Sequence, residues 1–487
     1  MDLKQKEKTF SSLPIDCWLG VLDYLDELSD LASISAVSRD LHALTLPLLY
    51  KKISWEWNSV PLSRILRLFR TVIQNPNLAS FIQHVTLLSA QKNVEQHNWN
   101  NEKVKDNWEW KNKISKFNDV IEVAQGVIKK AEFPEEAVPK WNSAIEDGNA
   151  YALVAILLSQ LHNLVSVRLD YTFVWQSGFP GLMLRHALFS APNGTMSKFA
   201  HLATVDYGSN VPLSEEEEPL YGHYPEGYPS CDPSQFMAWF HLPSVVSISI
   251  WLRNFQDTII SQKQLEQVHT LMLARSTLAD QEVYDLLQHT PNLKSLHLGL
   301  AYKTSPALDN PYILLDALES VSHTVEALSM GVEYYPFSRG NHALDYNDWG
   351  NREAFQGFLK MFPKIRSAEV PITVLLGVFP EEAPDIKTVL PSSLEELCLQ
   401  WDSQEMMGQT WDWETNLLDR VRELLVDLRS HLPRLKRVVI RQMAWFPEQR
   451  GDSEKERREM QADCALAGID FHVVFDWLSP GLWTERD

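Results

Sequence analysis

One recurrent apolar pattern, Leu-x-x-Leu-x-x-Leu-x-Leu, dominates the sequence beyond residue 55. Each copy ends in alternating apolar residues, which is typical of a strand with one buried face. The copies recur about every 34 residues on average, which is longer than the 20–29 residues of a leucine-rich repeat. Self-similarity of this kind predicts a repeat array that lengthens without thickening its core. Taking the second apolar position of each copy as the register residue gives Leu164, Leu202, Val245, Val268, Leu293, Val325, Ile365, Leu394 and Leu435.

Helical patterns fill the gaps between these copies. Thr277-x-x-Asp280 has the spacing of a capping box before a helix that ends at Pro291. The apolar residues of 417–428 predict another helix, residues 351–361 a third and residues 117–130 a fourth. We therefore expect an α/β fold with a curved parallel sheet inside and helices outside. A doubly wound sheet also alternates strand and helix, but it would lack the recurrent Pro-x-Leu-x-x-Leu entry seen at Pro243, Pro291, Pro363, Pro391 and Pro433.

The first fifty residues have a different pattern, with three short helical segments in close succession. Pro14 suits a first-turn position, Ser29 and Ser38 suit N-cap positions, and Pro47 is expected to bend or end the third helix. All three segments are apolar on more than one side. A segment this short cannot bury that much apolar surface within itself, so it needs something to pack against.

This segment resembles the F-box motif. The resemblance is carried, in order, by Leu13-Pro14-x-Asp16, Val21-Leu22-x-x-Leu25, Asp30-Leu31, Val37-Ser38-Arg39 and Pro47-x-Leu49-Tyr50. Asp16 stands where the family more often has Glu, and Cys17 where it has Ile or Leu. The resemblance implies docking to the adaptor subunit of SCF (cullin-RING) ubiquitin ligases, and through it to the cullin. It places in that apolar contact or its immediate support Leu13, Pro14, Val21, Leu22, Leu25, Leu31, Val37 and Leu41.

A plain three-helix cap on a solenoid, built from the same apolar residues, is the alternative interpretation of this segment. The repeats are also similar to the irregular leucine-rich halves of F-box proteins common in filamentous fungi. The expected organisation is an F-box at 11–55, then a linking region at 56–150 that holds a first strand, a polar Trp-containing insertion and a helix. An irregular leucine-rich-repeat solenoid follows at 151–478, with an inserted loop at 208–235. The acidic run at 215–218 in that loop is either a binding element or a solvated tip.

Composition narrows the choice of partners. The chain has 487 residues, with 44 Lys and Arg against 64 Asp and Glu, for a net charge of −20. This balance disfavours nucleic acid, because affinity for phosphate backbones comes from concentrated Lys and Arg. Apolar stretches are shorter than the roughly 20 residues of a membrane helix, and no secretory signal is evident, so we expect a cytoplasmic or nuclear protein with no membrane partner. Four widely spaced cysteines predict neither a disulfide framework nor a zinc site.

No catalytic or phosphate-binding motif is present in the sequence, so neither a cofactor nor a metal site nor an enzymatic activity is expected. Strand alternation predicts an exposed inner face that mixes polar and apolar side chains, among them Ser249, Met272, His297, Ser329 and Glu369. Bulky aromatics gather at or just past the strand ends. We expect them either to form an exposed rim that contacts a client protein or to pack beneath neighbouring loops as core. They are Tyr171, Tyr207, Trp251, Tyr302, Tyr334, Tyr335, Trp401 and Trp445.

These observations lead to one expected function and one alternative. The first is a non-catalytic substrate-recognition subunit of an SCF-type ubiquitin ligase, which holds a client near the charged conjugating enzyme. The alternative is a scaffold that binds the adaptor and other partners through its repeats without directing ubiquitination.

Overall fold

The computed structural model describes residues 14–25, 27–89, 114–175, 178–211, 232–253, 265–302, 311–334, 355–377, 379–402, 411, 416–443 and 454–475. In this part of the chain, twelve parallel strands form one sheet in strict sequence order, from β1 to β12. The strands are β1 (Lys52–Glu56), β2 (His84–Leu88), β3 (Ser166–Leu169), β4 (Thr204–Tyr207), β5 (Ser247–Ile250), β6 (Thr270–Ser276), β7 (Ser295–Tyr302), β8 (Ala327–Tyr334), β9 (Ser367–Pro371), β10 (Glu396–Asp402), β11 (Arg437–Met443) and β12 (Asp470–Phe475).

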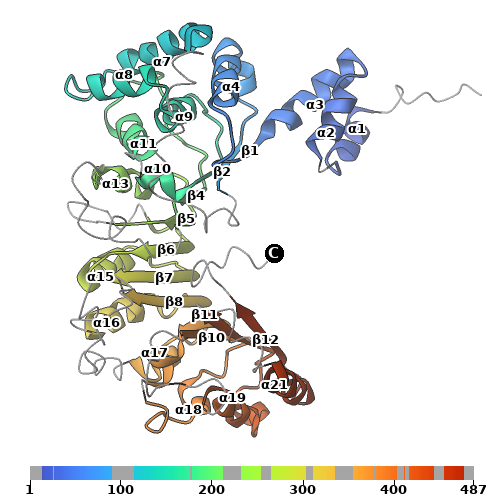
Figure 1. Ribbon diagram of the computed structural model, residues 1–487, viewed down its shortest axis with the longest axis vertical. Coiled ribbons are helices and arrows are strands. Elements are labelled where there is room, and N and C mark those ends of the chain that lie inside the picture. Colours follow the sequence, from blue (N-terminus) through green and yellow to red (C-terminus); the bar gives the residue numbers. More distant parts are fainter. Residues whose placement is uncertain are drawn as a thin grey trace, which may run out of the picture.

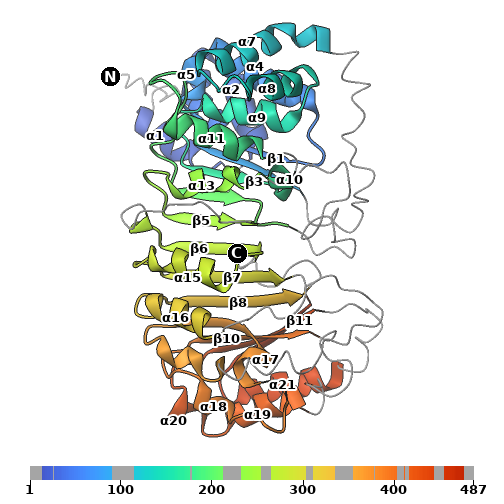
Figure 2. The ribbon, with the colours of Figure 1, turned by 90° about the vertical axis from the view of Figure 1, so that its left-hand side faces the viewer.

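The sheet is curved, with the strands on the inside of the arc and most helices on the outside (Figure 1). Figure 2 shows β5–β8 stacked in order, with helices α13, α15 and α16 lying over them. A doubly wound sheet reverses its strand order at a switch point, and this sheet does not. The α/β architecture with a parallel sheet inside is therefore confirmed, and it is compatible with a curved solenoid.

The register residues predicted from the sequence locate nine of the strands. Each of the nine lies two residues before a strand, from Leu164 before β3 to Leu435 before β11. The strands pair in register, so one apolar side chain from each strand falls into a single row across the sheet, which we call the lateral apolar row. From β2 to β12 this row is buried throughout: Val85, Val167, Val205, Ile248, Leu271, Leu296, Leu328, Ala368, Leu397, Val438 and Phe471.

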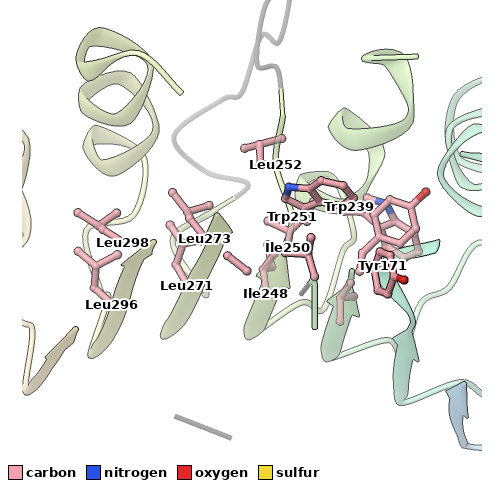
Figure 3. Packing of buried hydrophobic residues seen from close by; sticks show 14 of the residues in the cluster. Tyr171, Trp239, Ile248, Ile250, Trp251, Leu252, Leu271, Leu273, Leu296 and Leu298 are labelled. Atoms are coloured by element: carbon pink, nitrogen blue, oxygen red, sulfur yellow. The ribbon is translucent and has the colours of Figure 1, made fainter. Parts of the chain in front are cut away.

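Figure 3 shows part of this packing. The side chains of Leu271, Leu273, Leu296 and Leu298 leave β6 and β7 on the same side of the sheet, toward the outer helices. All four are essentially fully buried. A buried leucine of this kind contributes about 1.5–3 kcal/mol relative to exposure, so the row and its neighbours supply the main stabilisation of the array.

Helices connect successive strands. They are α4 (Leu62–Gln74), α5 (Pro76–Ala79), η3 (Ile114–Phe117), α7 (Asn118–Lys130), α8 (Val138–Glu146), α9 (Ala150–Ser159), α10 (Tyr171–Trp175), α11 (Phe179–Phe189), α13 (Ser234–Phe240), α15 (Asp280–Gln288), α16 (Pro311–Val321), η5 (Phe358–Met361), α17 (Ile372–Leu376), α18 (Ile386–Val389), α19 (Leu418–Leu425), α20 (Leu428–His431) and α21 (Glu454–Leu466). The helix predicted near residues 117–130 is confirmed as α7.

Three helix predictions need correction. Among the described residues of the helix predicted over 351–361, the 3-10 helix η5 (Phe358–Met361) forms in place of an α-helix. Helix α15 begins at Asp280, and the carboxylate of Glu282 accepts the Ala279 N–H at 2.8 Å. The predicted capping box at Thr277 is therefore wrong, because the Thr277 hydroxyl donates instead to the Arg253 carbonyl at 2.6 Å. The single helix predicted over 417–428 is divided into α19 and α20, with Asp427 between them in a left-handed conformation at φ 53°.

The N-terminal segment folds into α1 (Ile15–Leu22), α2 (Leu28–Ser35) and α3 (Arg39–Lys51). Ser38 caps α3 as predicted, since its side chain accepts the Leu41 N–H at 3.2 Å. Helix α2 starts after Glu27, so Ser29 is not its cap. Pro47 does not end α3, which continues to Lys51 and leads directly into β1.

The sheet and its core continue across the predicted segment boundaries. Strand β1 at Lys52–Glu56 begins inside the range assigned to the F-box and pairs with β2. Helices α4, α7 and α8 of the expected linking region contribute Phe69, Ala124 and Trp141, among others, to the same core as the later strands and helices. The sheet thus starts directly after α3. Within the expected loop at 208–235, residues 212–231 lie outside the described part, and α13 begins at Ser234. Residues 90–113, which hold most of the Trp-containing insertion, also lie outside it.

A buried carboxylate ties three strand ends together. Asp170, which directly follows β3, is fully buried. It accepts the Ser89 N–H after β2 at 2.8 Å and the Asn210 side-chain amide after β4 at 2.7 Å. Its other oxygen accepts the Thr172 N–H at 3.1 Å and the Thr172 hydroxyl at 2.7 Å. Asp170 therefore satisfies donors on three consecutive repeats.

We predict that Asp170→Ala lowers the free energy of unfolding by about 3 kcal/mol, because it leaves several buried donors without an acceptor. Denaturant unfolding followed by circular dichroism measures the change. Asp147→Ala, at an exposed aspartate, is the matched control and should change stability by less than about 0.5 kcal/mol. Equal stability of the two variants would contradict the role given to Asp170.

Candidate functional site: the N-terminal helices and the concave face

The three N-terminal helices form a small body with few buried side chains. Leu22 and Leu31 are nearly fully buried, and so is Thr45, whose hydroxyl donates to the Leu41 carbonyl at 2.8 Å. Leu22 and Leu31 come from α1 and α2, and Thr45 from α3. These contacts hold the helices together but leave most of their apolar side chains uncovered.

Large hydrophobic side chains are exposed here to an unusual degree. Six of the thirteen exposed large hydrophobics in the described part of the chain lie within residues 15–37. Tyr24 is 88% exposed and Val37 is 73% exposed. Concentrated exposed apolar surface marks a protein or membrane interaction site. We call these six residues the N-terminal apolar set: Ile15, Leu19, Val21, Tyr24, Leu28 and Val37.

The structure divides the predicted adaptor-contact residues into two groups. Pro14, Val21 and Val37 are exposed and available to a partner. Leu25 and Leu41 are half-buried, while Leu22 and Leu31 support the helices from inside. Leu13 lies outside the described residues.

Four members of the apolar set were not among the predicted contacts: Ile15, Leu19, Tyr24 and Leu28. Helical spacing indicated an apolar face containing Ile15 and Leu19, but spacing alone does not tell which side of a helix remains uncovered. Tyr24 lies beyond the end of α1, where no periodicity applies.

The charged residues between positions 9 and 38 are all acidic, with no Lys, Arg or His among them. Asp16, Asp23, Glu27 and Asp30 are exposed on and between α1 and α2. Helices α1 and α2 therefore offer apolar burial to a partner rather than cationic contacts to phosphate groups.

The aromatic residues expected at an exposed rim prove to be core where the structure describes them. Tyr171, Tyr207 and Trp251 have no exposed surface, and Trp401 is nearly buried, so the expectation of an exposed rim is wrong for all four. The side chains of Tyr302 and Tyr334, and the whole of Tyr335 and Trp445, lie outside the described part.

Contacts inside the fold accompany the burial of these aromatics. The Tyr207 hydroxyl donates to Gln235 Oε1 at 2.6 Å, and Trp401 Nε1 donates to the Trp411 carbonyl at 2.9 Å. The rings of Tyr171 and Trp251 pack edge to face, 6.4 Å between centroids (Figure 3). Hydrogen bonds at the polar tips of Tyr207 and Trp401, and the ring contact of Tyr171 with Trp251, thus favour burial of the four aromatic bodies.

The concave face also differs from the prediction. The polar and mixed side chains of this face were expected to be exposed. Yet five register partners in one row across β5 to β9 are all buried: Ser249, Met272, His297, Ser329 and Glu369. Ion pairs between side chains of the row account for part of this cover. Arg168 Nε lies 3.2 Å from Asp206 Oδ2 on the next strand, and Arg441 Nε lies 2.8 Å from Glu369 Oε1. Burial raises the pKa of Asp206, against the opposing effects of the Arg168 charge and the hydrogen bond from Ser209.

Groups that could carry metal or thiol chemistry are sparse. Within the described ranges, no group of three or more His, Cys, Asp or Glu side chains could hold a metal ion. Cys17 is exposed, whereas Cys398 and Cys464 are buried. Burial and the nearby Asp463 raise the pKa of Cys464 to about 11, so its reactive thiolate form is scarce at neutral pH. Among the described residues, no helix has both the length and the apolar character needed to cross a bilayer.

No known protein family model matches the chain, and no curated protein matches it significantly.

We predict that Trp251→Ala and Trp401→Ala each lower the free energy of unfolding by about 3–5 kcal/mol through lost burial, while leaving capture of a bound client unchanged. Chemical denaturation and a pull-down with the same variants measure the two effects. Tyr312→Ala, at an exposed aromatic on α16, is the control and should leave stability unaltered. Lost capture with full stability would restore the exposed-rim interpretation.

Proposed function

We propose that the chain is the substrate-receptor subunit of an SCF-type, cullin-RING ubiquitin ligase. In this proposal the three N-terminal helices are an F-box that binds the adaptor, and the parallel-sheet array is an irregular leucine-rich-repeat solenoid that holds a client protein. One observation carries the proposal: the N-terminal apolar set is exposed on the same helices whose sequence resembles the F-box motif. Burial of such a set against an adaptor would remove the exposed apolar surface.

The proposed division of labour needs no catalytic side chain in this protein. A receptor accelerates ubiquitin transfer by holding the client close to the charged conjugating enzyme, which replaces an encounter in solution with a positioned one. Helix α3 ends at Lys51 and strand β1 begins at Lys52, so no residue separates the last N-terminal helix from the sheet. This direct connection supports the proposed role. A cytoplasmic or nuclear location belongs to the same proposal.

The alternative scaffold function shares the adaptor contact and differs in its consequence. A scaffold would bind the adaptor without shortening the lifetime of any bound protein. Adaptor binding alone therefore does not separate the two functions, whereas client turnover does.

We predict that the double variant Val21→Asp, Leu28→Asp loses adaptor binding by at least about a hundredfold, because it buries two unpaired charges in an apolar contact. Both side chains are exposed in the free protein, so its stability should be unchanged. Isothermal titration with purified adaptor measures the affinity, and thermal unfolding checks the fold.

The matched control is Val426→Asp, Leu466→Asp, which places the same charges at exposed apolar positions near the other end of the chain. This control should bind the adaptor as tightly as the unmodified protein. If the N-terminal variant also binds normally, the N-terminal apolar set is not the docking surface and the proposal fails.

A further inference from the structure

Three buried polar side chains stand side by side on the concave face. His297 on β7 is the register partner of Ser329 on β8, and Ser329 is the register partner of Glu369 on β9. Neighbouring strands are about 4.8 Å apart, and register partners project from the same face of a sheet. Glu369 and Ser329 have no exposed surface, and His297 is 4% exposed.

Each of the three keeps one hydrogen-bonding atom without a partner in the described part of the chain. These atoms are His297 Nδ1, Ser329 Oγ and Glu369 Oε2. The other oxygen of Glu369 is fully engaged: Gln400 Nε2 donates to it at 3.1 Å, and Arg441 Nε lies 2.8 Å away. A buried polar atom without a partner costs about 1–3 kcal/mol, so three of them on adjacent strands indicate a site that accepts a ligand.

The charges of the site decide what kind of ligand fits. Burial and the Arg441 charge lower the pKa of His297 to about 3, so its ring is neutral at physiological pH. Burial and the Arg441 charge, which disfavour a proton on the His297 ring, also disfavour a cationic ligand beside it. An anion is disfavoured as well, because it would face the open oxygen of Glu369. A neutral group that both donates and accepts hydrogen bonds remains.

We propose that His297, Ser329 and Glu369 form a binding site for a primary carboxamide, whose NH₂ donates to Glu369 Oε2 and whose carbonyl accepts from the Ser329 hydroxyl. The site goes beyond the proposed receptor function and does not depend on adaptor binding. Its carboxamide is supplied either by a free small molecule or by an Asn or Gln side chain of a client.

The test is NMR of the full chain labelled at the histidine rings, with the His297 signal assigned by its loss in His297→Asn. Acetamide, methylammonium and acetate are three probes of similar size that are neutral, cationic and anionic. We expect acetamide alone to shift the His297 signal with saturation. N-acetylglutamine N′-methylamide distinguishes the sources: a matching shift shows that a polypeptide side chain fits, and no shift restricts the site to small free amides.

Two variants locate the effect. Glu369→Gln should abolish the acetamide shift. Ser329→Ala should weaken acetamide binding at least fivefold, and it provides the test if Glu369→Gln does not fold. Ser295→Ala, at a half-buried serine on β7 in the neighbouring row, is the matched control and should leave the shift intact. The proposal is overturned if acetamide causes no shift, if methylammonium or acetate shifts the signal equally, or if Ser329→Ala binds acetamide as well as the control.

Discussion

The lateral apolar row is the constraint on which the rest of the molecule depends. Each strand from β2 to β12 places one buried apolar side chain in it, and the in-register parallel pairing leaves no freedom to slip by one residue without turning that side chain to the concave face. The outer helices cover the row, and the strand spacing it enforces positions every residue of the concave face. Both the ion pair of Glu369 with Arg441, two strands apart, and the proposed carboxamide site follow from that spacing.

Sequence reasoning recovered most of this array and missed its ends for a definable reason. The residue two positions before a strand is Leu, Val or Ile for ten strands, and the register residues located nine of them; Ile82 before β2 fits the pattern but was not among the register residues. Two residues before β1 the chain has Tyr50, and two residues before β12 it has Gly468. The aliphatic pattern is therefore absent at both places, although the strands form. Edge strands are held by one neighbour and by tertiary packing, which a repeat consensus does not encode.

Burial of individual side chains was harder to predict than their face. Alternation correctly assigned His297, Ser329 and Glu369 to the face opposite the leucines, but it could not tell that they would be buried. The same limit applied to Tyr207 and Trp401, whose partners Gln235 and Trp411 lie on segments far from any strand consensus. At the N-terminus the opposite outcome was equally hard to predict, because a helical pattern does not show that apolar side chains such as Val21 and Val37 remain exposed.

The molecule thus combines an N-terminal segment that exposes apolar side chains with a sheet array whose side chains are largely buried against one another. This arrangement suits a receptor in which one part docks and another part holds a client. The most direct measurement of this account is the lifetime, in cells, of the proteins captured by the full chain, compared between the unmodified chain and a chain with Leu13 and Pro14 replaced by Ala. The account predicts that at least one captured protein becomes longer-lived and more abundant when the docking residues are lost. Unchanged turnover of every captured protein would contradict it and leave the scaffold function in its place.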